Sequence, residues 1–356
     1  MITLLVPTMN RSEFVIRLLR YYWRLNFRGA IFIGDSSNAE HIERTKKAIE
    51  VFRGKLNINY REYPGINNAK CMQQLLDLVT TPYVTFLGDD DFLVPSALEK
   101  CTLFLDSHPD YSAAHGVGVG LGLKSPGPSG EVAWVRLYEQ PVIESESASQ
   151  RLLKHMSNYS VSLFSVHRVE TWRKMFQDIF PLTDVRFTEL QSCCISVIRG
   201  KIKELDCFYL VRQSHPQIYG LPAVQDWVAS TEWYPSFRIF RDSLTSQLSD
   251  QEKINTDKAR ETIDLAFWTY VANELKRFLR GTYSAPRLMR LAGMIPGARK
   301  GWRASRRALR SLNLMARDEI GLDTLLRSSS RYHADFMPIY RAMTEDNQEF
   351  LEDIRK

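Results

Sequence analysis

Hydrophobic and polar residues follow two alternating periods along the first part of the chain. Short apolar runs predict buried strands at 2–6, 30–34, 56–61 and 83–87. Amphipathic stretches between them predict helices at 12–25, 39–53 and 65–79. Strands that alternate with helices at this spacing indicate an α/β fold with a mainly parallel sheet flanked by helices.

The pattern continues beyond residue 95 but becomes less regular. Helices are expected at 95–106, 145–156, 168–179 and 187–199, and strands at 111–123, 131–138, 160–166 and 201–211. From about residue 225 long helical stretches dominate, with breaks expected near 245–252, 281–286 and 295–301. We therefore expect an α/β unit over 1–220, with halves 1–110 and 111–220, and a mostly helical region over 221–356.

Polar side chains gather where the predicted strands end. Thr8 and Arg11 follow the first strand, and Asp35 follows the second. The acidic triplet (Asp89, Asp90 and Asp91) follows the fourth. Ligands of open α/β sheets bind beyond the carboxyl ends of the strands. The three clusters should therefore meet at one edge and form one site.

The acidic triplet has a physical reason to bind a cation. Adjacent carboxylates repel one another, so holding three together costs free energy unless positive charge offsets it. Mg²⁺ and Mn²⁺ take oxygen ligands and are commonly held by one or two protein carboxylates together with phosphate oxygens. A divalent ion that neutralises a departing diphosphate fits this triplet. A solvated acidic turn ahead of the helix at Pro95 is the alternative.

Composition narrows the class of protein. Of the 356 residues, 44% are hydrophobic and 25% charged, as in ordinary globular proteins, so disorder is not expected. The net charge of +6 favours an acidic partner, such as a nucleotide, a phospholipid or an anionic glycan. The excess is too small to indicate nucleic acid, and no zinc-finger or RNA-binding motif is present, so no nucleic-acid partner is expected.

Cysteine use and the N-terminal sequence indicate a cytoplasmic protein. The five cysteines are an odd number without a C-x-x-C pair, which argues against a disulfide framework or a structural zinc site. The N-terminal residues lack the basic and apolar parts of a signal peptide, and no apolar run approaches the roughly 18 residues of a membrane span. We expect a cytoplasmic location, with peripheral contact to the inner face of the membrane left open.

The strand ends together resemble a known family. The first strand runs into Pro-Thr-Met-Asn-Arg at 7–11, the second into Asp-Ser-Ser at 35–37, and the fourth lies within Pro-Tyr-Val-Thr-Phe-Leu-Gly-Asp-Asp-Asp at 82–91. Over roughly residues 1–215 this pattern resembles the GT-A glycosyltransferases of the family 2 type. The resemblance implies a Rossmann-like GT-A fold, with a nucleotide-binding half over 1–110 and an acceptor half over 111–220.

The resemblance also implies roles for individual residues and a cofactor, Mn²⁺ or Mg²⁺. Asp90 matches the metal-binding Asp of the family's D-x-D motif best, with Asp91 beside it, and His215 falls where a family His binds metal or diphosphate. Asp35 falls where a carboxylate contacts the base, usually uracil. The residues implied to contact the nucleotide sugar are Pro7, Thr8, Arg11, Asp35, Asn68, Lys70, Asp89 and Arg212.

Two positions depart from the family pattern. Gly88 stands where the first Asp of Asp-x-Asp-Asp is usual, which leaves the division of labour within the triplet open. Thr188 replaces the first acid of a Glu-Asp pair. Glu189 then occupies the position of the catalytic base, eleven residues before Gly200, with Asp184 as the alternative base.

The resemblance implies a metal-dependent, inverting glycosyltransferase of the hexosyltransferase type. It would move a sugar from a nucleotide sugar, a UDP-sugar by the Asp35 match, to a hydroxyl of a glycan or lipid-linked acceptor, as in surface glycan or glycolipid assembly. One alternative is a sugar nucleotidyltransferase, although the loop at 7–11 lacks the glycines of a phosphate loop. The other is a non-catalytic carbohydrate- or nucleotide-binding protein that keeps the fold. Aromatic residues such as Trp134 either stack on sugar rings or belong to the core.

The C-terminal region carries a basic block. Residues 276–317 contain twelve Lys or Arg and no Asp or Glu, and 287–317 interleaves arginines with apolar residues. Basic helices with an apolar face bind anionic membrane surfaces. The pattern fits membrane contact through 287–317, or an anionic acceptor. A solvated helical face or an oligomer contact is the alternative.

Overall fold

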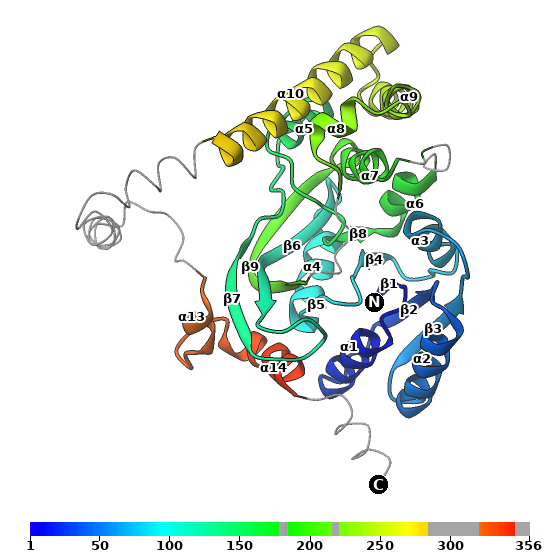
Figure 1. Cartoon of the computed structure of the whole chain (residues 1–356). Coiled ribbons are helices and arrows are strands. Elements are labelled where there is room, and N and C mark those ends of the chain that lie inside the picture. Colours follow the sequence, from blue (N-terminus) through cyan, green and yellow to red (C-terminus); the bar gives the residue numbers. More distant parts are fainter. Residues whose placement is uncertain (178–181, 183, 216–220, 284–319, 346–356) are drawn as a thin grey trace, which may run out of the picture.

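A single β-sheet organises the chain (Figure 1). The computed structural model describes residues 1–177, 182, 184–215, 221–283 and 320–345. Within these residues nine strands form one sheet in the order β3-β2-β1-β4-β8-β6-β9-β5, with β7 paired to β6.

The first half of the sheet is parallel. Its strands are β1 (Ile2–Thr8), β2 (Ala30–Asp35), β3 (Asn57–Glu62) and β4 (Tyr83–Phe86). They pair in parallel in the order β3-β2-β1-β4. Helices α1 (Ser12–Arg24), α2 (Ala39–Phe52) and α3 (Asn68–Leu76) connect them in turn. All four strands therefore end at the same edge of the sheet.

The second half of the sheet is mixed. Its strands are β5 (Phe92–Leu93), β6 (Tyr111–Leu123), β7 (Val132–Tyr138), β8 (Val166–Arg168) and β9 (Lys201–Ser214). β6 and β9 pair in parallel, whereas β5, β7 and β8 are antiparallel to their partners. The expected α/β class, a sheet flanked by helices, is confirmed, and its parallel part carries the first strand ends.

Both faces of the sheet are covered, which explains why its first strands read as continuous apolar runs. In β1, Leu4 and Val6 pack into the core on the face of α1 and α2. Leu5 packs into the core on the opposite face, with residues of α3. All three side chains are fully buried, so β1 is covered on both faces.

The remaining helices extend both layers. They are α4 (Pro95–Ser107), α5 (Ala148–Ser157), α6 (Val169–Gln177), α7 (Val185–Arg199), α8 (Val224–Val228), α9 (Trp233–Glu252), α10 (Thr256–Tyr283), α13 (Leu322–Leu326) and α14 (His333–Thr344). α7 packs against α5, α6 and α9, and α10 packs against α5 and α9. Figure 1 shows this helical group at one end of the molecule, away from α13 and α14.

The described C-terminal helices therefore pack in two places. α9 and α10 lie on α5 and α7, whereas α14 lies beside α1 (Figure 1). Arg20 of α1 is fully buried at this contact and donates from Nη2 to the carbonyl oxygen of Ala342 at 2.6 Å. Phe336, Ile339 and Met343 of α14 belong to the same core as β1 and α1.

Two sequence-based expectations differ from the structure. The strand predicted at 160–166 is irregular until Val166, because the Ser165 N–H donates to the Ser162 carbonyl at 3.0 Å and closes a turn. The break predicted near 245–252 lies later, between α9 and α10, since α9 runs unbroken to Glu252 and α10 begins at Thr256. Leu244 and Leu248 lie one turn apart on its buried face, and their packing outweighs the polar residues around them.

Helix length and composition also bear on membrane contact. Across the stretches that the structure describes, no helix combines the length and the apolar character needed to cross a membrane. The basic segment 287–317 and the break expected at 295–301 lie in 284–319, outside the described residues. The break expected at 281–286 lies there in its second half, and α10 includes 281–283.

Candidate active site

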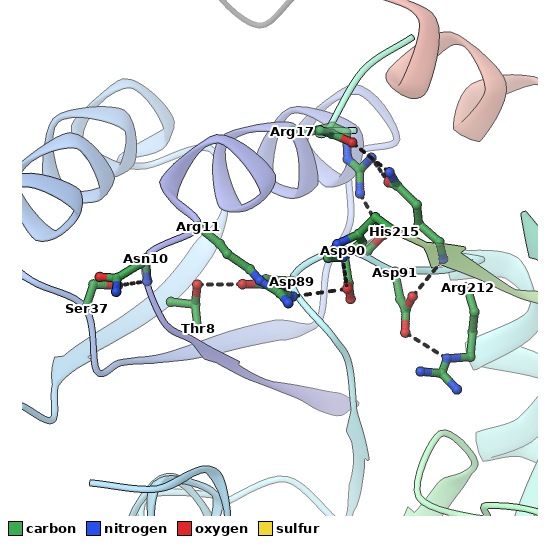
Figure 2. Close-up of polar contacts among 12 residues, drawn as sticks. Thr8, Asn10, Arg11, Arg17, Ser37, Asp89, Asp90, Asp91, Arg212 and His215 are labelled. Atoms are coloured by element: carbon green, nitrogen blue, oxygen red, sulfur yellow. Dashed lines mark hydrogen bonds and ion pairs between the residues drawn. The ribbon is translucent and has the colours of Figure 1, made fainter. Parts of the chain in front are cut away.

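The short strand β5 brings the acidic triplet to the end of β9. Asp91 directly precedes Phe92, and Phe92 pairs with Val211 in the antiparallel register of β5 and β9. The residues just beyond Val211 therefore face the triplet across the strand ends. Figure 2 shows the result: Arg212 and His215 from β9 and its end meet side chains that follow β1 and β4.

Asp89 is tied to the loop after β1. The Thr8 hydroxyl donates to Asp89 Oδ2 at 2.6 Å, and Arg11 Nη1 donates to Asp89 Oδ1 at 3.0 Å. Both carboxylate oxygens are thus bonded, and Asp89 is only 3% exposed. Its role in this arrangement is to hold Arg11 in the site.

Asp90 lies between the two halves of the site. Arg11 Nη1 lies 3.1 Å from Asp90 Oδ2, and His215 Nε2 lies 2.7 Å from the same oxygen. The His215 ring stacks on Phe14 of α1, with 5.1 Å between ring centroids, which fixes the imidazole plane. The Asp90 side chain is 12% exposed, more than the 4% and 1% of its neighbours.

Asp91 is held entirely by β9. Arg212 Nε donates to Asp91 Oδ2 at 3.2 Å, and the backbone N–H of Gln213 donates to Asp91 Oδ1 at 3.0 Å. Arg212 also donates from Nη1 to the Tyr138 hydroxyl at 3.0 Å, and its guanidinium lies 4.3 Å from the Phe164 ring centroid. Asp91 therefore orients Arg212 toward the site.

Burial and charge shift the pKa values of the triplet unequally. Burial, reinforced by the charge of Asp90, raises the pKa of Asp89 to about 6 and that of Asp91 to about 7. Burial acts on Asp90 too, but the hydrogen bond from His215 and the nearby charges of Arg11 and Arg212 outweigh it and lower the pKa of Asp90. Asp90 therefore holds its negative charge most firmly of the three.

A third arginine, on α1, stabilises the site. Arg17 of α1 is fully buried and donates from Nη2 to the Asp90 backbone carbonyl at 2.7 Å. Its Nη1 donates to Gln213 Oε1 and to the Pro128 carbonyl. Arg17 thus joins the triplet, β9 and the loop before β7. Burial lowers the pKa of Arg17 to about 10, so the guanidinium remains charged at neutral pH.

Gly88 packs directly against the triplet. A Cβ atom at this position would lie 2.5 Å from Asp90 Oδ1 and 3.0 Å from Asp91 Oδ2. Any side chain at residue 88 would displace these carboxylates. The absence of an acid at this position, noted from the sequence, therefore has a steric reason in this chain.

Asp90 and His215 form the pair best suited to hold a divalent cation. A divalent cation would replace the proton between His215 Nε2 and Asp90 Oδ2, and the two atoms would then offer an imidazole nitrogen and a carboxylate oxygen, a donor set that Mn²⁺ accepts more readily than Mg²⁺. Among the described residues no three His, Cys, Asp or Glu side chains converge on one point. The remaining ligands would have to be phosphate and water oxygens, as is usual for such ions.

The two carboxylates predicted as alternative bases have different surroundings. Both oxygens of Asp184 are engaged: Oδ1 accepts from the Phe187 N–H at 2.9 Å as the N-cap of α7, and Oδ2 accepts from Trp227 Nε1 at 2.8 Å. Glu189 Oε1 accepts from the Tyr159 hydroxyl at 2.9 Å. Burial raises the pKa of Glu189, and the charges of Arg186 and Arg212 oppose this rise. Glu189 therefore lies within the electrostatic reach of the residue that binds Asp91.

The other predicted donor residues are placed at the edge of the site. Asp35 is fully buried, and it accepts from the Ser37 N–H and from the Tyr60 hydroxyl, each at 2.9 Å. Pro7 is half-buried within β1. Asn68 and Lys70 are exposed at the start of α3. These residues lie near the strand ends. Within the described residues, none of the hydrogen bonds given for them reaches the acidic triplet.

Sequence reasoning missed several residues that build the site. Arg17, Gln213, Phe14 and Tyr138 each contact a predicted site residue or its neighbour. One signal was available for Arg17, which lies three residues after Phe14 and four before Tyr21 on the apolar face of α1. A charged residue on such a face requires a buried partner.

Comparisons with known proteins give fold-level matches only. The sequence matches no protein-family profile and no curated protein. Among solved structures, residues 1–349 of TarS from S. aureus match at 16% identity with a TM-score of 0.43, covering 80% of this chain and 92% of that one. The same protein bound to UDP-GlcNAc matches at 14% and 0.42, covering 80% and 93%. The mannosyltransferase PcManGT from Pyrobaculum calidifontis, solved with GDP-Man and Mn²⁺, matches at 11% and 0.41, covering 89% and 88%. Scores this low do not assign a function.

Proposed function

We propose that this chain is a glycosyltransferase of the GT-A type, which moves a sugar from a nucleotide sugar to a hydroxyl acceptor. The observation that carries the proposal is the meeting of Asp90 with Arg11 and His215 at the edge where β1, β2 and β4 end. A buried cluster of opposite charges at the carboxyl edge of a parallel sheet is suited to a diphosphate and a cation.

Different residues of the site are assigned to the leaving group and to the acceptor. A divalent ion held by Asp90 and His215 would supply charge neutralisation at the departing diphosphate. Arg11, held by Asp89, presents fixed positive charge to the diphosphate, and Arg212, held by Asp91, presents fixed positive charge on the side of the acceptor. Fixed dipoles and charges of this kind need little reorganisation when the sugar–phosphate bond breaks.

Glu189 is proposed as the general base. It takes the proton from the acceptor hydroxyl as that oxygen attacks the anomeric carbon, which gives inversion in a single displacement. Burial raises its pKa, which brings a carboxylate nearer to the range useful for proton transfer. Asp184 is less suited, because its oxygens are already used by the α7 cap and Trp227.

A specific observation keeps a binding protein as the second candidate. Arg11 and Arg212 already offset the charge of Asp89, Asp90 and Asp91 in part, which reduces the need for a metal ion. Such a site could bind a nucleotide or sugar without turnover. A sugar nucleotidyltransferase is a weaker candidate, because the loop after β1 has no glycine that would let the backbone come close to a phosphate.

Nucleotide-dependent thermal stabilisation tests the proposal. UDP, GDP and ADP and their sugars would be added with Mn²⁺ or with EDTA to wild type, Asp90→Asn and Glu99→Gln. Glu99, exposed on α4, is the matched control for loss of one carboxylate. Ligand at a hundred times Kd stabilises by about 2.7 kcal/mol. We expect a Mn²⁺-dependent shift in wild type and Glu99→Gln that Asp90→Asn loses. No shift with any nucleotide would exclude a donor site, whereas a shift without sugar release or transfer would favour the binding protein.

We also propose that the acceptor is met at an anionic membrane surface. One face of α10 exposes Leu265 (59%), Trp268 (51%) and Leu279 (50%), with the exposed Lys276 beside them. The basic block begins on this helix and continues in the sequence through 287–317. Exposed apolar side chains beside basic ones match a surface of anionic lipid.

Vesicle sedimentation tests the membrane proposal. Wild type should bind vesicles containing phosphatidylglycerol, and less so phosphatidylcholine alone. The double variant Leu265→Ser/Trp268→Ser should bind more weakly, whereas Leu103→Ser on α4, which removes an equally exposed leucine (61%), should not. Equal binding to both lipids, or no effect of the double variant, would contradict the proposal.

A further inference from the structure

Next to the site, one face of the sheet carries a row of three glycines. Gly118, Gly120 and Gly122 alternate along β6, so their missing side chains would all project from the same face. On β7 their partners are Tyr138, Arg136 and Trp134, respectively. On β9 their partners are Leu210, Arg212 and Ser214. We call these three glycines the glycine strip.

The glycine strip seats the indole ring of Trp134. A Cβ atom at Gly122 would lie 2.3 Å from Trp134 Nε1 and 2.5 Å from Cε2, so only glycine leaves room for this ring position. At Gly120 the nearest atom to such a Cβ would be Trp134 Cζ3, at 3.6 Å. The ring therefore lies over the strand, and the strip fixes where it sits.

Trp134 in turn positions a cation. The Arg136 guanidinium carbon lies 4.2 Å from the Trp134 ring centroid, a distance at which a cation–π interaction holds it. Arg136 is exposed, and no carboxylate within the described part of the chain pairs with it. An arginine stacked on an aromatic ring keeps the edge of its guanidinium available for an oxyanion.

Two arginines flank the same glycine. Gly120 pairs with Arg136 on β7 and with Arg212 on β9, so the two side chains leave the sheet on one face with only a glycine between them. Strands two apart in a sheet are separated by roughly 10 Å. Tyr138, two residues from Arg136, accepts the hydrogen bond of Arg212, which itself binds Asp91. The pair therefore adjoins the acidic triplet on the side of β7.

We propose that Arg136, seated on Trp134, and Arg212 bind an anionic group of the acceptor, a phosphate or a carboxylate, over Gly120. The inference rests on the proposed function and names its acceptor class: a glycan that carries negative charge. The donor diphosphate is expected on the other side of the triplet, beside Arg11 and His215. Arg136 would therefore serve acceptor binding and not donor binding.

Three matched sugars test the inference: methyl glucoside, glucuronic acid and glucose 6-phosphate. Binding is followed through the indole N–H resonance of Trp134, assigned with Trp134→Phe. Charge-assisted hydrogen bonds are the stronger class, so we expect the two anionic sugars to bind at least about tenfold more tightly than the neutral one. Comparison of the two anions separates phosphate from carboxylate recognition. Arg136→Gln should remove this preference and Arg136→Lys should retain part of it, whereas Arg61→Gln on the exposed edge strand β3 should not change it.

The outcomes separate this inference from the proposed function. Equal binding of neutral and anionic sugars, an unchanged preference in Arg136→Gln, or no response of the Trp134 resonance to any of the three overturns the acceptor site. The Mn²⁺–nucleotide thermal shift is measured on the same proteins. If Arg136→Gln loses that shift, the arginine belongs to the donor site and the inference is wrong. If wild type lacks the shift while anionic sugars still bind, the proposed function fails and the anion site stands.

Discussion

His215 Nε2 lies 2.7 Å from Asp90 Oδ2, a contact between residues 125 positions apart in the sequence. The pairing of β5 with β9 produces it, because it places the end of β9 over the residues that follow β4. Phe14 stacks on the imidazole from α1, so three separate segments fix one hydrogen bond.

The first prediction concerns His215. Replacing it with Asn removes one proposed ligand of the cation and leaves Asp90 in place. We expect the Mn²⁺ concentration that gives half of the nucleotide-dependent stabilisation to rise at least about tenfold, which corresponds to 1.4 kcal/mol of binding free energy. His108→Gln, at an exposed position after α4, is the control. An unchanged Mn²⁺ requirement in His215→Asn would remove His215 from the metal site.

The second prediction separates the two carboxylates of α7. Glu189→Gln should lower kcat by about 10²- to 10⁴-fold and leave nucleotide binding intact, as expected for loss of a general base. Asp184→Asn should instead lower stability by about 1 kcal/mol, because it weakens the helix cap and the bond to Trp227. Turnover assays and denaturant unfolding of both variants check this. The reverse pattern, with turnover lost only in Asp184→Asn, assigns the base to Asp184.

The third prediction concerns the fit of Trp134 on the glycine strip. Gly122→Ala should destabilise the protein by about 1–3 kcal/mol, because its Cβ would overlap the indole. Gly120→Ala has a 3.6 Å contact at the same place and should stay within about 0.5 kcal/mol of wild type.

A double-mutant cycle checks this origin. In a Trp134→Ala background the penalty of Gly122→Ala should disappear, giving a coupling energy of about 1 kcal/mol or more. Midpoints of urea unfolding measure all four proteins. An equal penalty in both backgrounds would show that Gly122 acts through the backbone and not through Trp134.

The fourth prediction concerns acid stability. Burial lowers the pKa of His155 and of His167 to about 4, from an ordinary value of 6.5. A lowered pKa means that the unfolded chain binds protons first, so the stabilising effect is complete above about pH 6.5 and is lost as the pH falls toward 4. The shift corresponds to about 3 kcal/mol per histidine.

One substitution isolates that effect. Asp89 and Asp91, with raised pKa values, respond in the opposite direction, so the comparison of wild type with a histidine variant is the informative one. Neither ring nitrogen of His155 has a hydrogen-bond partner in the described structure. His155→Leu should therefore fold at neutral pH and lose less stability than wild type between pH 6.5 and 4. Identical pH profiles would contradict the prediction.

The sequence predicts the parallel half of the sheet well, for a physical reason. Strands buried on both faces are apolar throughout, and β1, β2 and β4 have this pattern. The rule that ligands bind at carboxyl ends then locates Thr8, Arg11 and the acidic triplet together. Local information was sufficient here because each strand end follows directly from its own apolar run.

The rest of the site depends on contacts that a local pattern does not encode. β5 has only two residues, too few for any periodicity, yet its pairing decides which residues meet Asp91. The engagement of Asp35 by Tyr60 depends on the pairing of β2 with β3. Asp184 is a recognisable helix cap, but only once α7 is known to begin at Val185 and not at 187.

The contact of α14 with α1 has a consequence for synthesis of the protein. Arg20 donates a hydrogen bond to the Ala342 carbonyl at this contact, and the two residues are 322 positions apart. At a ribosomal rate of about 5–20 residues per second, roughly 16–64 seconds pass between the synthesis of Arg20 in α1 and that of Ala342 in α14. During that interval the nascent chain exposes an arginine and the apolar side chains around it. Chaperones would therefore find a binding site on α1 until α14 has been synthesised and packs against it.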